Sequence, residues 1–136
     1  MDWTAQVDGY CERVDFTFWS EPVNAVTNIA FIITALICLN MTVRRAREVF
    51  YNFALCAILA IIGIGSFLFH TFATRWAGAA DVLPILIFIL LYVYAATRRY
   101  LGMGHVSAGL AVIGAMLFSS AFPGLWNSVL PSINGS

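Results

Sequence analysis

The sequence has little charge and no lysine. Its seven arginines balance seven acidic residues, and together they make up 10% of the 136 residues. An average soluble domain carries about 25% charged residues, and no basic patch is present here to bind nucleic acid. The chain is apolar instead, with 61% hydrophobic residues and a mean hydropathy of +0.86. This composition predicts an integral membrane protein whose partners are lipids or other proteins of the bilayer.

Cysteine is also scarce, and the three cysteines form no pattern. Cys38 and Cys56 fall in separate apolar stretches, where cysteine behaves as a small apolar residue. Cys11 stands by itself near the N-terminus. We therefore expect no disulfide framework and no thiol chemistry.

Long apolar stretches cover residues 23–43, 50–72, 82–97 and 106–125. A transmembrane helix needs about 20 residues to cross about 30 Å of hydrocarbon. The third stretch is short for this purpose unless Ala79 and Ala80 extend it. The pattern predicts an all-α, polytopic bundle of four transmembrane helices. Residues 1–136 would form a single transmembrane domain that begins with an acidic extramembrane segment, residues 1–21.

The N-terminal segment lacks the basic start and the small-residue cleavage site of a signal peptide. Arginines cluster after the first and third apolar stretches and are sparse elsewhere: Arg44, Arg45 and Arg47, then Arg98 and Arg99, against Arg13 and Arg75 on the other side. The positive-inside rule places these clusters in the cytoplasm and the N-terminus outside it. The short loops and the absence of lysine favour a bacterial inner membrane.

Three polar residues stand in or beside the apolar stretches: Ser66 and His70 in the second, and Asp81 at the start of the third. Such groups are costly in a membrane and indicate function by default. Ser66 and His70 are four residues apart, so a helix places them on one face. The preceding glycines, Gly63 and Gly65, would let a neighbouring helix approach closely.

Each of these residues has an ordinary structural interpretation as well. A serine in a membrane helix often bonds to the backbone carbonyl four residues earlier, and a histidine near a helix end can simply reach the interface. An aspartate before an apolar run is a common helix N-cap, and Pro84 would then lie in the first turn. Only the combination of the three residues favours a site.

The stretch Gly-Ile-Gly-Ser-Phe-Leu-Phe-His at residues 63–70, followed by Asp-Val-Leu-Pro at residues 81–84, resembles the alkaline ceramidase family. That family belongs to a superfamily of membrane hydrolases that includes the adiponectin receptors. Its members have a serine, a histidine four residues later and an aspartate eleven residues after that, which is the spacing found here. The resemblance covers residues 8–125 and corresponds to the N-terminal half of a seven-helix fold. It implies that the chain is incomplete at its C-terminus.

The acidic N-terminal segment resembles the segment that binds calcium in alkaline ceramidases. The resemblance implies a structural calcium ion held by carboxylates and one backbone carbonyl: Asp8, Glu12, Asp15 and Glu21, with Tyr10 supplying the carbonyl. Calcium prefers six to eight oxygen ligands, so several carboxylates in a short loop suit it. The segment does not have the spacing or the central glycine of an EF-hand. The alternative is a solvated acidic segment without a metal.

The resemblance also implies a catalytic zinc ion with His70 as one of its ligands. Catalytic zinc generally has three protein ligands and an open position for water. The family supplies the other two ligands from a late His-x-x-x-His pair, which this sequence does not contain. His105 is the only other histidine, and we expect it in a cytoplasmic loop, a bilayer away from His70. In these roles Asp81 would orient the water and take its proton, and Ser66 would stabilise the oxyanion.

Two functions are therefore open. The first is a zinc-dependent intramembrane amidase that hydrolyses ceramide-like lipids of sphingolipid metabolism to a sphingoid base and a fatty acid. The second is a membrane protein of the same superfamily without catalysis, either receptor-like or a binding partner, or an inactive fragment. The absence of the His-x-x-x-His pair favours the second.

Overall fold

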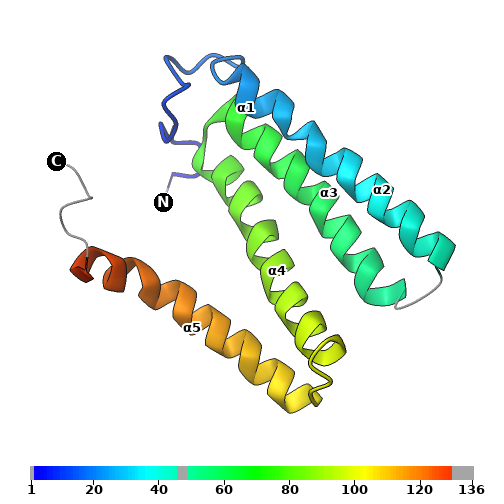
Figure 1. Ribbon diagram of the computed structural model, residues 1–136. Coiled ribbons are helices and arrows are strands. Elements are labelled where there is room, and N and C mark those ends of the chain that lie inside the picture. Colours follow the sequence, from blue (N-terminus) through cyan, green and yellow to red (C-terminus); the bar gives the residue numbers. More distant parts are fainter. Residues whose placement is uncertain (1, 46–48, 130–136) are drawn as a thin grey trace. The chain divides into compact units, whose positions relative to one another are not determined.

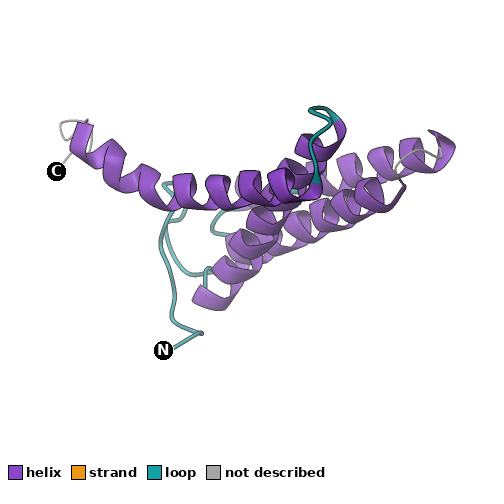
Figure 2. Ribbon diagram, turned by 90° about the horizontal axis from the view of Figure 1, so that it is seen from below, coloured by secondary structure: helices purple, strands orange, loops and turns teal. Residues whose placement is uncertain are grey.

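The computed structural model describes residues 2–45 and 49–129 as helices joined by loops (Figure 1; Figure 2). The helices follow in the order α1 (Pro22–Thr27), α2 (Ile29–Arg45), α3 (Val49–Phe72), α4 (Arg75–Arg99) and α5 (His105–Val129). The described ranges contain no strand, and one isolated β-bridge joins Gln6 to Thr74. The all-α fold predicted from the sequence is confirmed.

Four helical segments are long and apolar enough to cross a membrane: Pro22–Arg45, Val49–Phe72, Arg75–Arg99 and His105–Gly124. The first segment contains both α1 and α2, which are separated at Asn28. There the Asn28 side-chain amide donates to the Asn24 carbonyl oxygen at 2.9 Å. The predicted number of spans agrees with the structure. Arg47 of the first arginine cluster and the C-terminal residues 130–136 lie outside the described residues.

The helix of the third span is longer than its apolar stretch, because α4 begins at Arg75 after a connection of two residues, 73 and 74. The first N–H groups of a helix have no partner within the helix. Here the backbone N–H groups of Arg75 and Trp76 donate to the carbonyl oxygens of Ala5 and Trp3, both at 3.0 Å. The N-terminal segment thus caps α4. These acceptors are distant in sequence, so the local pattern could not reveal the earlier start.

The chain divides into two compact units, Met1–Ile89 and Leu90–Ser136. In the first unit α1 and α2 pack against α3 (Figure 1). In the second unit the end of α4 meets the start of α5, where the Tyr94 hydroxyl lies 2.7 Å from His105 Nδ1. Gly102 turns the chain there with a φ of 62°, a left-handed conformation that glycine adopts without strain. His105 is the first residue of α5, so its assignment to a loop was wrong.

Two glycines of α3 let its neighbours approach, as the sequence predicts. A Cβ atom on Gly63 would lie 3.0 Å from Ile32 Cγ1 and 3.1 Å from Phe31 Cβ, both of α2. A Cβ atom on Gly65 would collide with the Ala80 carbonyl of α4. Small residues at such crossings are typical of helix packing in membranes. Gly63 and Gly65 thus bring α2 and α4 close to the part of α3 that carries Ser66 and His70.

Pro84 lies inside α4 rather than in its first turn, which corrects the expectation. Proline has no backbone N–H, so it cannot donate to the carbonyl four residues earlier. That carbonyl belongs to Ala80, the group that faces Gly65 of α3. The helix therefore leaves one carbonyl without its regular donor at the place where α3 and α4 touch.

Candidate functional site

His70 lies in the last turn of α3, and its side chain is held by a carboxylate from the start of α1. Its Nδ1 atom is 2.5 Å from Glu21 Oε2, and the exposed fractions of the two side chains are 8% and 2%. Glu21 precedes Pro22 as the N-cap residue of α1. The Tyr10 ring packs edge-on against the imidazole, with ring centroids 4.7 Å apart. His70 is therefore buried and bonded, and does not simply reach the interface.

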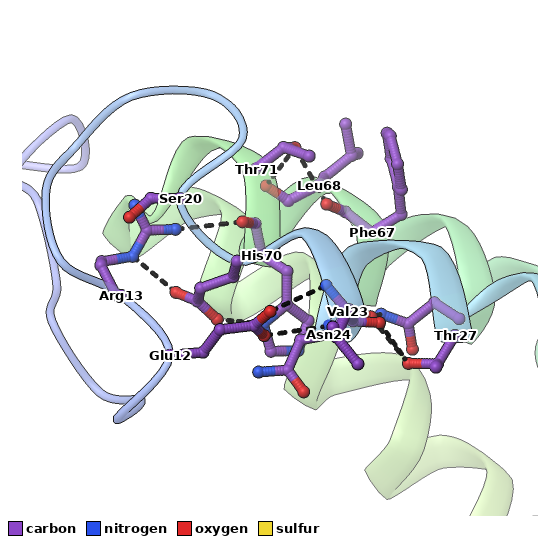
Figure 3. A network of polar contacts seen from close by, with 12 residues as sticks. Glu12, Arg13, Ser20, Val23, Asn24, Thr27, Phe67, Leu68, His70 and Thr71 are labelled. Carbon is purple, nitrogen blue, oxygen red and sulfur yellow. Dashed lines mark hydrogen bonds and ion pairs between the residues drawn. The ribbon is translucent and has the colours of Figure 1, made fainter.

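Arg13 completes this buried group, and Figure 3 shows its guanidinium between the N-terminal loop and the end of α3. Arg13 Nε is 2.5 Å from Glu21 Oε1, and the Arg13 side chain is only 1% exposed. Arg13 Nη2 donates to the His70 carbonyl oxygen and Nη1 to the Asp15 carbonyl oxygen, both at 3.0 Å. One side chain thus links the loop, the start of α1 and the end of α3.

Asp81 is buried on α4, past the first turn of that helix, so the N-cap interpretation was wrong. Its carboxylate lies close to the Ser66 hydroxyl and to the His70 side chain. Its Oδ1 atom is buried without a hydrogen-bond partner in the part of the chain that the structure describes. Ser66 is also buried. The structure therefore brings together the three residues that the sequence singled out.

The residues predicted to bind calcium differ in their surroundings. Glu12 accepts hydrogen bonds from the backbone N–H groups of Val23 and Asn24 at 2.8 and 3.1 Å, and so caps α1 (Figure 3). Asp15 Oδ1 accepts from the Thr17 hydroxyl at 2.7 Å and from the Thr17 N–H at 3.0 Å. These bonds, the hydroxyl first, lower the pKa of Asp15. Asp8 is exposed.

The calcium ligand set does not fit the ion as it is folded. Both oxygens of Glu12 face backbone N–H groups, both oxygens of Glu21 face side-chain nitrogen atoms, and the Tyr10 carbonyl accepts the Arg13 backbone N–H at 3.0 Å. Calcium needs six to eight oxygen atoms directed at one point. Within residues 2–45 and 49–129 no group of three His, Cys, Asp or Glu side chains is arranged to hold a metal ion.

The surroundings of His70 fit a single zinc ligand better. In the tautomer that carries its proton on Nδ1, the imidazole donates to Glu21 and keeps the Nε2 lone pair free. Metal-bound histidines commonly donate their other N–H to a carboxylate in this way. Asp81 Oδ1 has no hydrogen-bond partner in the described residues, so it could accept a proton or a hydrogen bond from a water molecule. His70 would supply one ligand of a larger set.

Sequence reasoning missed Arg13 and the pairing of Glu21 with His70. Arg13 entered only as one of two basic residues on the outer side. A single arginine among five acidic residues of the first 21 was a usable signal, because buried charges are normally paired. Which acid it pairs with depends on contacts between α1 and α3, which the local sequence does not specify.

The buried polar residues form a site among helices that are long and apolar enough to cross a membrane: Ser66, His70, Asp81 and Glu21. These helices fit a multi-pass membrane protein. The family model described as Ceramidase matches residues 2–129. The chain belongs to the ceramidase family, which confirms the resemblance read from residues 8–125. Membership indicates ceramide hydrolysis in general, a lipid substrate and a membrane setting. No curated protein and no solved structure matches the chain.

Proposed function

We propose that this chain forms the N-terminal part of a zinc-dependent intramembrane amidase that hydrolyses ceramide to a sphingoid base and a fatty acid. The observation that carries the proposal is the buried Asp81 carboxylate. It lies beside Ser66 and His70 with one oxygen free of hydrogen bonds in the described residues. A buried polar atom without a partner is costly, so it favours a bound group of the reaction as its partner.

His70 is the proposed zinc ligand, through Nε2, and Glu21 fixes the ring by accepting a hydrogen bond from Nδ1–H. A bound zinc ion would act as a Lewis acid on the amide carbonyl and would acidify the attacking water. Asp81 Oδ1 takes one proton of that water and returns it to the amide nitrogen as the C–N bond breaks, so that the sphingoid base leaves as an amine. Ser66 donates a hydrogen bond from its hydroxyl to the oxygen that becomes negative, a contribution of about 2.7 to 4 kcal/mol where such donors have been removed.

The surroundings of the site suit a ceramide. Ser66 and Asp81 lie on helices apolar enough to cross a membrane. Both hydrocarbon chains of the lipid can therefore stay in hydrocarbon while its amide reaches the polar residues. Arg75 and Trp76 at the start of α4 mark the nearby helix end. We place the site near this end of the span, with the amide close to the polar headgroup region.

A second function is a member of the family without catalysis, either receptor-like, a binding partner or an inactive fragment. It is favoured by the histidine content, since the sequence contains only His70 and His105. These belong to different units, and His105 is exposed and bonded to Tyr94. A three-histidine zinc site would need ligands that this sequence does not supply.

The substitution His70→Ala in the complete protein separates the two functions. If the protein is the proposed amidase, His70→Ala should abolish ceramide hydrolysis and zinc binding. Fatty acid release and metal analysis measure the two losses. Ser66→Ala should lower the rate by about 10²- to 10³-fold. His105→Ala is the matched control and should keep both activity and zinc. Full hydrolysis by the His70→Ala protein would exclude the proposed role of His70 as zinc ligand. If the unsubstituted protein neither hydrolyses ceramide nor binds zinc, the second function is supported instead.

The proposed orientation has the N-terminal segment outside the cytoplasm, and the membrane is proposed to be a bacterial inner membrane. Cys11 is exposed in the N-terminal segment, whereas Cys38 and Cys56 lie within α2 and α3. A membrane-impermeant maleimide should therefore label Cys11 in intact cells, and Cys11→Ser should remove the label. Labelling only after the cells are broken would reverse the orientation.

A further inference from the structure

Glu12 and Arg13 are adjacent in the chain, yet each serves the end of a different helix. Glu12 places its negative charge on the first N–H groups of α1. Arg13 donates to the His70 carbonyl oxygen. This carbonyl is one of the last four of α3, and the last four carbonyls of a helix receive no hydrogen bond from within the helix. Each charge has the sign that its helix terminus favours. The two residues together hold the N-terminal segment to both helices.

Arg13 also lies among the oxygen atoms that the family resemblance assigns to calcium. Its guanidinium contacts Glu21 Oε1 and the Asp15 carbonyl oxygen, and its backbone N–H contacts the Tyr10 carbonyl. Of the predicted ligand atoms the guanidinium faces Glu21 Oε1, and the Tyr10 carbonyl is occupied by the Arg13 backbone N–H; the contact at Asp15 is with the backbone carbonyl and not the carboxylate. A guanidinium is always charged and has five donors in a planar fork, so it can join several oxygen atoms as a metal ion would.

We propose that Arg13 is the built-in cation of the N-terminal segment and takes the place of a calcium ion at Glu21. The charge of Glu21 is matched within the protein, at 1% and 2% side-chain exposure for the pair. A calcium ion at the same oxygens would have to displace a buried arginine and would meet its charge. The segment of this chain then folds against α1 and α3 without calcium. The proposal concerns this segment alone and does not depend on ceramide hydrolysis.

The test is the thermal unfolding of the complete protein in detergent, with calcium at about 1 mM, the range of extracellular calcium modules, or with the chelator EGTA. The wild-type Tm should be the same in both. Arg13→Gln should lower the Tm by about 5 °C or more, because the buried Glu21 loses its arginine counter-charge and keeps only the bond to His70. Arg75→Gln removes an exposed arginine from the start of α4 and should leave the Tm unchanged.

Arg13→Gln should also make the Tm depend on calcium, since the carboxylate oxygens are released, whereas Arg75→Gln should not. A purely structural role for Arg13 would not produce this calcium response. If Arg13→Gln does not fold, the proposal is tested by calorimetric titration of the wild-type protein with calcium chloride. No heat of calcium binding is expected. Stoichiometric calcium binding that Glu12→Gln or Glu21→Gln abolishes would overturn the proposal. So would an Arg13→Gln protein with the wild-type Tm.

Discussion

The two compact units contain similar apolar helices but differ in what surrounds their polar and small residues. In the first unit His70 is buried and bonded to Glu21, and Gly63 and Gly65 are crowded by neighbouring helices. In the second unit His105 is exposed, and a Cβ atom on Gly109 or Gly114 would meet nothing within 4 Å. Hydropathy alone does not distinguish the two units. Helix packing buries the polar residues of the candidate site in the first unit.

The largest effect on stability should come from the buried ion pair of the first unit. Glu21→Gln keeps the shape of the side chain and removes its charge, so Arg13 is left buried without an anion. Breaking such a pair costs about 3 to 5 kcal/mol of unfolding free energy. His105→Ala in the second unit should change stability by no more than about 0.5 kcal/mol, as exposed sites do.

Equilibrium unfolding of both variants in the same detergent, followed by tryptophan fluorescence, measures this difference. Equal stability losses for Glu21→Gln and His105→Ala would contradict the contrast between the units. In that case the Arg13 and Glu21 pair would contribute no more than an exposed contact. Double substitution of Arg13 and Glu21 should cost less than the sum of the single changes, because the second change removes an unpaired charge.

Replacing glycine by alanine should change the stability by a smaller amount, and the sign of the change should differ between the two units. Gly65→Ala puts a Cβ atom against the Ala80 carbonyl and should destabilise by about 1 to 3 kcal/mol, the usual cost of overpacking. Gly114→Ala meets open space within α5 and should stabilise by up to about 1 kcal/mol through helix propensity. Thermal unfolding of the two variants checks both signs, and destabilisation by Gly114→Ala would show a close contact on α5.

Much of the candidate site could be predicted from the sequence. Ser66 and His70 are one helical turn apart, and the glycines before them indicated a close helix crossing, which the structure confirms at Gly65 and Ala80. The apolar stretch did not reveal that α4 begins at Arg75, because its first N–H groups are capped by carbonyls of residues 3 and 5. Pro84 was then placed in the wrong turn for the same reason. Both features depend on contacts between segments that are far apart in the chain.

The sequence by itself determined the membrane class, the four apolar spans, the family and the spacing of Ser66, His70 and Asp81. The membrane class and the spans follow from composition, the shared face of Ser66 and His70 follows from the helical period, and the family follows from the resemblance of residues 63–70 and 81–84 to known proteins. Only the tertiary structure decided how the charges of the N-terminal segment are used. Glu21 meets His70 and Arg13 because α1 packs against α3, and Glu12 faces α1 because the loop folds back. A buried charge must be paired where the fold places it, and its partner depends on contacts between segments that are distant in the sequence.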